Sequence, residues 1–275
     1  MIVVSGATGR LGGRVARRLA AAGIPQRLLV RDPGRAPRLP GAEVAVAEYG
    51  DPDAVRRALA GAGTVLMVSG SESTDRVDRH RSFVDAAAAA GTGHLVYVSF
   101  LNAAPDATFT LARDHWATEQ HIRASGLPHT FLRDSLYADF LPMMTGADGV
   151  IRGPAGDGRV ALVAQDDIAD VATAVLRDPG PHAGATYDLT GPAALSFAEI
   201  AALLTEVTGR PVRYHAEALD EAYASRASYG APDWQVEAWV STYTAVAAGE
   251  LSTVSDDVLR LTGHPATPAA AVLST

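Results

Sequence analysis

The feature that most constrains the fold is a glycine-containing turn at residues 6–12, with the sequence GATGRLG. It follows a short apolar run at residues 2–4. A helix is expected after it, because Leu11, Val15 and Leu19 recur at helical spacing. A strand, a glycine turn and a helix in this order suit a dinucleotide diphosphate, because small residues let the backbone come close and the amides at the helix start face the anion. The turn predicts a nicotinamide cofactor; the alternative is an ordinary strand-to-helix turn.

Composition excludes several other classes. The 275 residues include 31 acidic and 23 basic side chains, a net charge of −8 that disfavours nucleic acid and anionic membranes as partners. The absence of cysteine rules out disulfides, thiolate metal sites and cysteine nucleophiles. No apolar segment is long enough for a membrane span, and the first residues lack a basic leader, so we expect a cytoplasmic protein with a small-molecule ligand.

Apolar strand-like runs alternate with helical ones along the first half of the chain. Strands are expected at residues 2–4, 27–30, 44–47, 65–68, 95–98 and 129–132, and helices at 52–59, 75–90 and 110–124. This alternation is typical of right-handed βαβ units. The predicted fold class is therefore α/β, a Rossmann-type doubly wound parallel sheet with a smaller, partly interleaved α/β C-terminal lobe.

A boundary is expected where the strand at 129–132 ends at Arg133, because an apolar segment and a glycine-rich stretch at 146–158 follow it. Residues 1–133 would form the NAD(P)-binding domain and 134–275 a smaller substrate-binding lobe. Residues 160–190 are expected to return to the first domain. Asp167 to Asp170 resembles a helix N-cap with an acid three residues later, and 187–189 resembles a strand, so we interpret these aspartates as caps rather than catalysts.

The end of the second strand selects between the two nicotinamide cofactors. An acid there binds a ribose diol, whereas an arginine binds a 2′-phosphate. Arg31 comes first after the strand and Arg35 could join it, which favours NADP(H) over NAD(H). The alternative is that Arg31 and Asp32 form a solvated turn pair.

Five segments carry a resemblance to a known family: GATGRLGGRVARRL, LVRDP, VLMVSGSE, GLPHTFLRDSLYADF and TYDLTGPAALSFAEIAALLTEVTG. Together they resemble the NmrA-like branch of the atypical short-chain dehydrogenase/reductases, closest to the NAD(P)H:quinone oxidoreductases and triphenylmethane dye reductases. The likeness spans nearly the whole chain and is loose after about Arg210. It implies a Rossmann domain, an interleaved lobe and a nicotinamide ring that faces a cleft between them.

The resemblance also implies cofactor contacts. Matching positions in the glycine turn and after the second strand are Gly6, Thr8, Gly9, Arg10, Leu11 and Arg31. Glu48 matches an acidic residue beside the adenine. Ser69 and Gly70 end the fourth strand, and Ser99 ends the fifth.

One departure from the family pattern concerns catalysis. Ordinary members use a tyrosine and, four residues later, a lysine to protonate a carbonyl oxygen. In this chain those positions fall on Leu111 and His115. Simple ketone chemistry is therefore disfavoured, whereas a quinone or a cationic conjugated dye delocalises the arriving electrons itself. Such an acceptor mainly needs to be held against the nicotinamide in a dry aromatic slot.

The slot walls are expected from the apolar segment after Arg133 and from the C-terminal lobe: Leu136, Tyr137, Phe140, Met143 and Met144, with Trp234 or Trp239. The alternative is plain core. Tyr137 and His115 are the catalytic candidates; His115 could orient the nicotinamide ribose or give a proton to a reduced quinone, and its alternative is a structural role.

The sequence therefore predicts an NADPH-dependent oxidoreductase that passes hydride to a quinone or a similar conjugated aromatic acceptor. Two alternatives stay open: a non-catalytic NADP(H)-binding redox sensor, and an isomerase or biosynthetic reductase.

No metal is expected because the eight histidines lack paired spacing. Arg10, Arg14, Arg17 and Arg18 are expected to form a solvated helix surface rather than a nucleic-acid face. A homodimer stays open.

Overall fold

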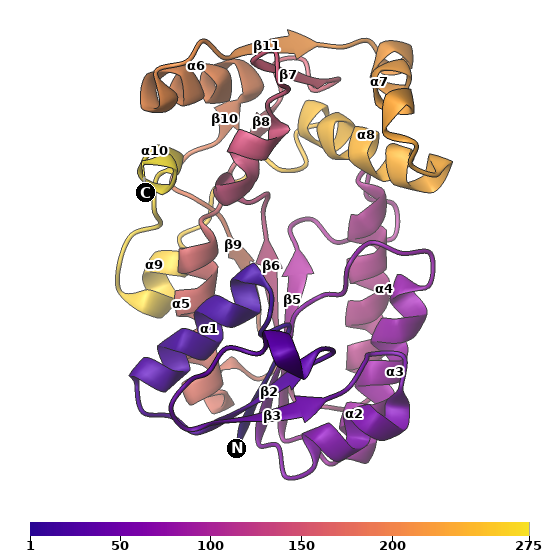
Figure 1. The fold of residues 1–275 in the computed structure, drawn as a ribbon, viewed down its shortest axis with the longest axis vertical. Helices are drawn as coiled ribbons and strands as arrows, with labels where there is room; N and C mark the ends of the chain where they lie inside the picture. The colour runs from indigo at the N-terminus through magenta and orange to yellow at the C-terminus, as the bar shows by residue number, and fades with distance from the viewer. Residues whose placement is uncertain (275) are drawn as a thin grey trace.

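Seven parallel strands form the central sheet, in the order β3-β2-β1-β4-β5-β6-β9 (Figure 1). The computed structural model describes residues 1–274. The strands of this sheet are β1 (Ile2–Ser5), β2 (Gln26–Val30), β3 (Ala42–Val46), β4 (Thr64–Met67), β5 (His94–Phe100), β6 (His129–Asp134) and β9 (Thr186–Leu189). The predicted doubly wound parallel sheet is confirmed, and each expected strand is present with bounds that differ by a few residues.

The strand order reverses beside β1. From β1 the chain moves outward to β2 and β3, and it then returns to the other side of β1 with β4, β5 and β6. In open parallel sheets this reversal leaves a crevice at the carboxyl ends of the two strands where it occurs, here β1 and β4.

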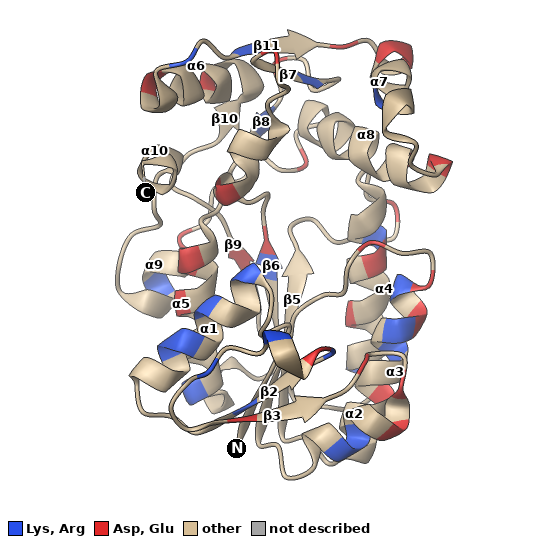
Figure 2. Cartoon of the chain, viewed as in Figure 1, with Lys and Arg blue, Asp and Glu red and all other residues tan. Residues whose placement is uncertain are grey.

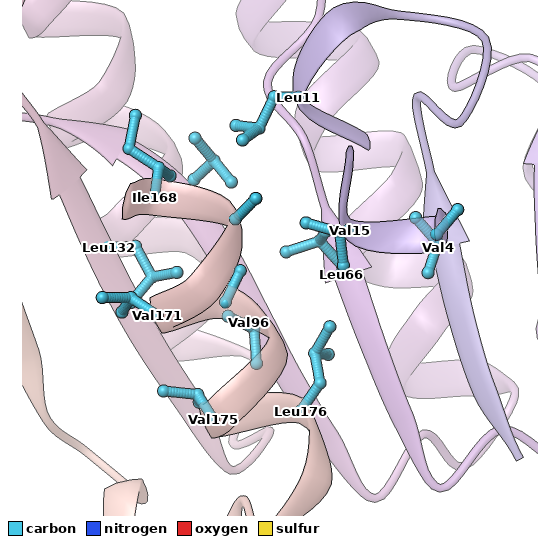
Figure 3. Close-up of a cluster of buried hydrophobic side chains, with 14 of the residues drawn as sticks. Val4, Leu11, Val15, Leu66, Val96, Leu132, Ile168, Val171, Val175 and Leu176 are labelled. Carbon is cyan, nitrogen blue, oxygen red and sulfur yellow. The ribbon is translucent and has the colours of Figure 1, made fainter. Parts of the chain in front are cut away.

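Helices cover both faces of the sheet (Figure 1). On one face lie α1 (Arg10–Ala21) and α5 (Gln165–Arg177), and on the other lie α2 (Pro52–Leu59), α3 (Arg76–Ala89) and α4 (Thr110–Ala124). In Figure 3, Leu11 and Val15 of α1 and the apolar side chains of α5 meet over the strand residues Val4, Leu66, Val96 and Leu132. This buried cluster fixes the start of α1 over the end of β1.

Helix α1 carries several arginines, and the neighbouring helix α5 carries acidic residues (Figure 2). Arg14 pairs with Asp139 at 2.8 Å, and Arg18 pairs with Asp166 at 2.8 Å and Asp170 at 2.6 Å. Both arginine side chains are about three-quarters buried, so the expectation of a solvated helix surface is wrong for them. Their pairing with Asp139 and with α5 supplies a structural reason for basic residues on this helix.

The start of α5 corrects another prediction, because the helix begins at Gln165 and Asp167 lies inside its first turn. The amide of Gln165 donates to Asp139 Oδ2 at 2.9 Å, so a carboxylate from a distant segment satisfies the helix start. Asp167 instead accepts from the amide and the hydroxyl of Thr267, each at 2.7 Å. It therefore anchors the C-terminal segment and does not cap its own helix.

The remaining elements form a second, smaller layer above the sheet (Figure 1). Two short sheets pair β7 (Val150–Gly153) with β11 (Arg213–Ala216) and β8 (Arg159–Val160) with β10 (Leu195–Ser196). The helical elements here are η2 (Ala138–Met144), α6 (Phe197–Thr208), α7 (Leu219–Arg226), η4 (Ala227–Tyr229), α8 (Asp233–Ala247) and α10 (Ala269–Leu273). Two 3-10 turns, η1 (Pro33–Arg35) and η3 (Gly180–His182), follow β2 and α5.

The chain returns to the large sheet after this layer begins. Strand β9 pairs with β6, and helix α9 (Asp257–Thr262) packs beside it, where Asp257 Oδ2 accepts from the amide of Asp188 at 2.8 Å. The boundary expected at residue 133 stays a prediction. Within residues 1–274, no helix has the length and apolar character needed to cross a membrane.

The contact between α1 and β1 generates a stability prediction. A Cβ on Gly12 would lie 2.4 Å from the carbonyl oxygen of Gly6 and 2.7 Å from that of Ser5, and backbone atoms cannot move away cheaply. We expect Gly12→Ala to lower the free energy of unfolding by about 3 kcal/mol in urea denaturation. Gly180→Ala is the control, because a Cβ there meets nothing within 4 Å. Equal stability of the two variants would contradict this packing.

Candidate functional site

A cavity of about 460 Å³ opens at the carboxyl ends of β1 to β4, where the strand order reverses. Every predicted cofactor residue except Ser99 lines it: Gly6, Thr8, Gly9, Arg10, Leu11, Arg31, Glu48, Ser69 and Gly70. Residues that the sequence did not single out also line it, namely Tyr49, Arg76 and Arg79. The structure thus brings four separate chain segments to one cavity.

The glycine turn forms the wall of the cavity at the start of α1. Gly6 has a φ of 64°, which favours glycine, and a Cβ there would lie 3.2 Å from the Cβ of Val68. No side chain caps the N-terminus of α1. The first amides of a helix have no partner within it, so these groups and the positive end of the helix dipole are available to an anion.

Three hydrogen bonds brace the cavity floor between β1 and the segments that follow β3 and β4. The buried Ser5 hydroxyl accepts from the Val68 amide at 2.9 Å and lies 2.5 Å from the Tyr49 hydroxyl. Tyr49 in turn donates to the Val68 carbonyl at 2.6 Å. Burial raises the pKa of Tyr49, so this phenol stays neutral. The floor is therefore a closed polar network, which no local sequence pattern signalled.

Arg31 and Asp32 occupy the position after β2 that is expected to select between NADP(H) and NAD(H). Arg31 is exposed and lines the cavity, and no side-chain hydrogen bond or ion pair within residues 1–274 holds its guanidinium. Asp32 instead caps η1 by accepting from the amide of Gly34 at 2.9 Å. Because the Asp32 carboxylate is engaged in this cap, the Arg31 guanidinium is the group available to bind a substituent on the ribose of the cofactor.

The acidic residue predicted beside the adenine is part of an ion pair. Glu48 accepts from Arg79 at 2.9 Å, and Arg79 also pairs with Asp75 at 2.7 Å. The loop between β4 and α3 also contacts the upper layer, because Gln235 of α8 donates to Glu72 at 2.9 Å. Helix α8 thus reaches a loop that lines the cavity.

The structure does not bring Ser99 to the cavity wall. Its side chain is 2% exposed, and its hydroxyl donates to Glu119 Oε1 at 2.7 Å. Glu119 also accepts two bonds from Arg133, at 2.8 Å and 2.7 Å. Ser99 is therefore part of a buried carboxylate–guanidinium cluster, whose partners lie too far apart in the sequence for a local pattern to reveal.

His115 lies in the interior of the protein, and the proton-donor role considered for it from the sequence stays a prediction. Its Nε2 accepts from Arg76 at 3.0 Å, so its Nδ1–H donates to the Tyr97 hydroxyl at 3.0 Å. Burial, helped by the positive charge of Arg76, holds the pKa of His115 well below its usual range. With both ring nitrogens engaged, the imidazole holds its neighbours in position, and its lowered pKa favours the neutral form.

His80 is a second buried histidine behind the cavity. It accepts from the amide of Gly70 at 2.8 Å, and its other ring nitrogen lies 2.9 Å from the hydroxyl of Thr118. Burial lowers the pKa of His80 to about 3. Its neutral ring thus holds the β4–α3 loop through the same glycine that lines the cavity.

Tyr137 and Phe140 lie next to the glycine turn. The guanidinium of Arg10 sits 5.1 Å from the centre of the Phe140 ring, and the two aromatic rings are 5.4 Å apart. The Tyr137 hydroxyl donates to Asp134 Oδ2 at 3.0 Å. Burial raises the pKa of Tyr137 and of Asp134 well above their usual ranges. The structure thus joins two of the predicted slot residues to a residue of the cofactor cavity.

The other predicted slot residues are more scattered. Leu136 and Met144 pack against the core of the upper layer, whereas Met143 is 64% exposed. Trp234 and Trp239 are half-buried on α8, and Trp239 contacts the ring of Tyr229. Their part in an acceptor slot stays a prediction.

The buried histidines generate a prediction of pH dependence. The folded protein keeps His80 neutral, whereas the unfolded chain protonates it below about pH 6.5. Its contribution to stability is therefore present above pH 6.5 and is lost as the pH falls toward 3. Between pH 6.5 and 5 we expect the wild type to lose about 2 kcal/mol more free energy of unfolding than His80→Gln, measured in urea.

Parallel pH curves for wild type and His80→Gln would show that His80 is not held neutral.

Comparisons with known proteins agree with this geometry. The NAD(P)H azoreductase of Xenophilus azovorans is 35% identical over 271 residues, which cover 97% of this chain and 94% of that protein. The crystal structure of the Escherichia coli NADPH-dependent quinone oxidoreductase QOR2 complexed with NADPH has a TM-score of 0.90 and 33% identity, and covers 100% of this chain and 99% of that one.

A second solved structure is similar along its whole length. The Citrobacter sp. triphenylmethane reductase complexed with NADP(H) has a TM-score of 0.88 and 32% identity, with 99% of each chain covered. Residues 1–229 match the NmrA-like family, which confirms the resemblance found in the sequence motifs. The chain belongs to the NmrA-like family.

Proposed function

We propose that this chain transfers a hydride from NADPH to a quinone or another extended aromatic acceptor. The chain is an NAD(P)H-dependent oxidoreductase, and NADP(H) is its cofactor, as in its relatives. The choice of an aromatic acceptor rests on one observation. Arg10, which lines the cofactor cavity, contacts the ring of Phe140, and Phe140 in turn contacts the ring of Tyr137.

Three features of the cavity fit the cofactor. The glycine turn keeps open a cradle that a side chain would fill, since a Cβ at Gly6 would meet Val68. The uncapped start of α1 suits a diphosphate, and the unpartnered guanidinium of Arg31 suits a 2′-phosphate. When bound, NADPH supplies the hydride; the residues of this chain bind and orient it.

The acceptor side requires positioning more than acid catalysis. Tyr137 and Phe140 offer flat apolar surfaces at the cofactor turn, and a quinone or dye stabilises incoming electrons by delocalisation. A reduced quinone also needs a proton. The Tyr137 hydroxyl is the candidate donor. Asp134 lies 3.0 Å from it, and burial raises the pKa of this carboxyl, which favours the protonated form that would return a proton to the phenol.

Cofactor choice tests the assignment of Arg31. We expect Arg31→Ala to raise the Kd of NADPH by about 10- to 100-fold, because a charge-assisted bond to a phosphate is lost, and to leave the Kd of NADH unchanged. Calorimetric titration measures both constants. Arg38→Ala, outside the cavity lining, is the control. An unchanged preference for NADPH would remove Arg31 from the site.

Turnover tests the reaction itself. The wild type should oxidise NADPH with a panel of quinones and dyes, and Tyr137→Phe should slow quinone reduction by about 100-fold without raising the Kd of NADPH. Tyr223→Phe, an exposed tyrosine on α7, is the matched control.

Two outcomes would contradict this account. Tight NADPH binding without oxidation by any acceptor would indicate a redox sensor. Full activity in both Tyr137→Phe and His115→Ala would show that neither side chain takes part, leaving positioning of the two reactants alone.

A further inference from the structure

Arg76 is the buried arginine of the cofactor cavity. Four arginines line the cavity, and Arg76 is 5% exposed, whereas the others reach solvent. It begins α3, directly after the loop that follows β4. Its Nε donates to the Gly70 carbonyl at 2.9 Å and its Nη2 to His115 at 3.0 Å. The side chain is thus held rigidly at the back of the cavity.

The charge of Arg76 is only weakly neutralised. Two of its partners, the Gly70 carbonyl and the His115 ring, are neutral. Its carboxylate partner is Asp114, at 3.4 Å, longer than the 2.7–2.9 Å of a strong charged hydrogen bond. Burial raises the pKa of Asp114, and the charge of Arg76 acts against that rise. Because buried charges are normally paired, this geometry favours a further negative charge near Arg76.

Neither a lysine nor a neighbouring histidine supplies a second cation behind the cavity among residues 1–274. The chain has no lysine, so all 23 of its basic residues are arginine. His80 and His115, which flank Arg76 among the described residues, are neutral because burial lowers the pKa of each. An arginine keeps its charge in proteins, so Arg76 is a fixed and buried positive charge at this wall.

The field of Arg76 reaches the predicted acceptor side. The pKa of Tyr137 is raised by burial, and the charge of Arg76 acts against that rise. The geometry agrees: the ring of His115, which Arg76 bonds, lies 6.0 Å from the ring of Phe100, and Phe100 packs against the same apolar cluster as the predicted slot residue Leu136. Arg76 therefore lines the cofactor cavity and is also linked, through His115 and Phe100, to the segment expected to form the acceptor slot.

We propose that Arg76 determines the charge of the acceptor that this enzyme prefers, by stabilising negative charge as it develops on a neutral acceptor and by disfavouring cationic ones. The inference rests on the proposed function. A neutral quinone that accepts a hydride becomes a hydroquinone monoanion, and one proton then completes the hydroquinone. A triphenylmethane cation that accepts a hydride becomes a neutral leuco compound. In both cases the C4–H bond of the dihydronicotinamide breaks and a bond from that hydrogen to the acceptor forms.

The two acceptor types should respond oppositely to loss of the charge. Relative to the free acceptor, a quinone gains negative charge in the transition state, which Arg76 stabilises. A dye cation is still partly positive in the transition state, and Arg76 repels it. In Arg76→Gln, kcat/KM for 1,4-naphthoquinone should fall at least about tenfold, while kcat/KM for malachite green should stay level or rise through a lower KM. Arg76→Lys, which keeps the charge, should recover part of the quinone activity.

Arg81→Gln is the matched control, because Arg81 lies on the same helix, pairs with Asp78 at the surface and is absent from the cavity lining. It should leave both activities unchanged. If Arg76→Gln does not fold, wild-type enzyme still tests the proposal with naphthoquinones that carry a sulfonate or a trimethylammonium group at the same position. The sulfonate should have the lower KM.

Three results would overturn the proposal. Equal losses of kcat/KM with quinone and with dye in Arg76→Gln would show that Arg76 only holds the β4–α3 loop. A rise in the Kd of NADPH that accounts for the whole loss of kcat/KM would make Arg76 a cofactor contact. In the wild type, equal KM values for the sulfonate and the trimethylammonium compound would show no charge preference. A wild type that reduces neither acceptor would refute the proposed function itself, so it is assayed first.

Discussion

The close approach of α1 to the end of β1 is the constraint on which the site depends. Gly12 allows it, because a Cβ there would lie 2.4 Å from the Gly6 carbonyl oxygen. The approach places the uncapped start of the helix over the crevice where the strand order reverses. The buried cluster between α1 and α5 holds the helix there, and the ion pairs of Arg14 and Arg18 add to it. Cofactor geometry thus follows from backbone packing.

The opposite wall of the cavity is built from buried polar side chains. His80 holds the Gly70 amide and Arg76 holds the Gly70 carbonyl, so one residue of the β4–α3 loop is bonded on both sides. Both histidines in this wall are neutral, which lets them accept from backbone and arginine donors. The cost of burying polar groups is offset by a set of matched partners, and the weakly paired guanidinium of Arg76 is the exception.

The sequence predicted what depends on neighbours along the chain. Strands, helices and the glycine turn follow from local periodicity and from glycine's small size, and the helix bounds of α2 and α4 were correct. Side-chain partners were not predictable in this way. His115 and Arg76 are 39 residues apart, and Asp167 bonds Thr267, 100 residues away, so the partners of His115 were not foreseen and the cap interpretation failed. Arg76 was missed because a basic residue near a helix start resembles an ordinary solvated charge.

The central claim is that the amides at the glycine turn bind the diphosphate of NADP(H). Calorimetric titration of the wild type with NADPH, and with reduced nicotinamide mononucleotide, which lacks the diphosphate, tests it most directly. The account predicts saturable one-to-one binding of NADPH and at least about 100-fold weaker binding of the mononucleotide. Absence of NADPH binding, or equal affinity for the two compounds, would contradict it.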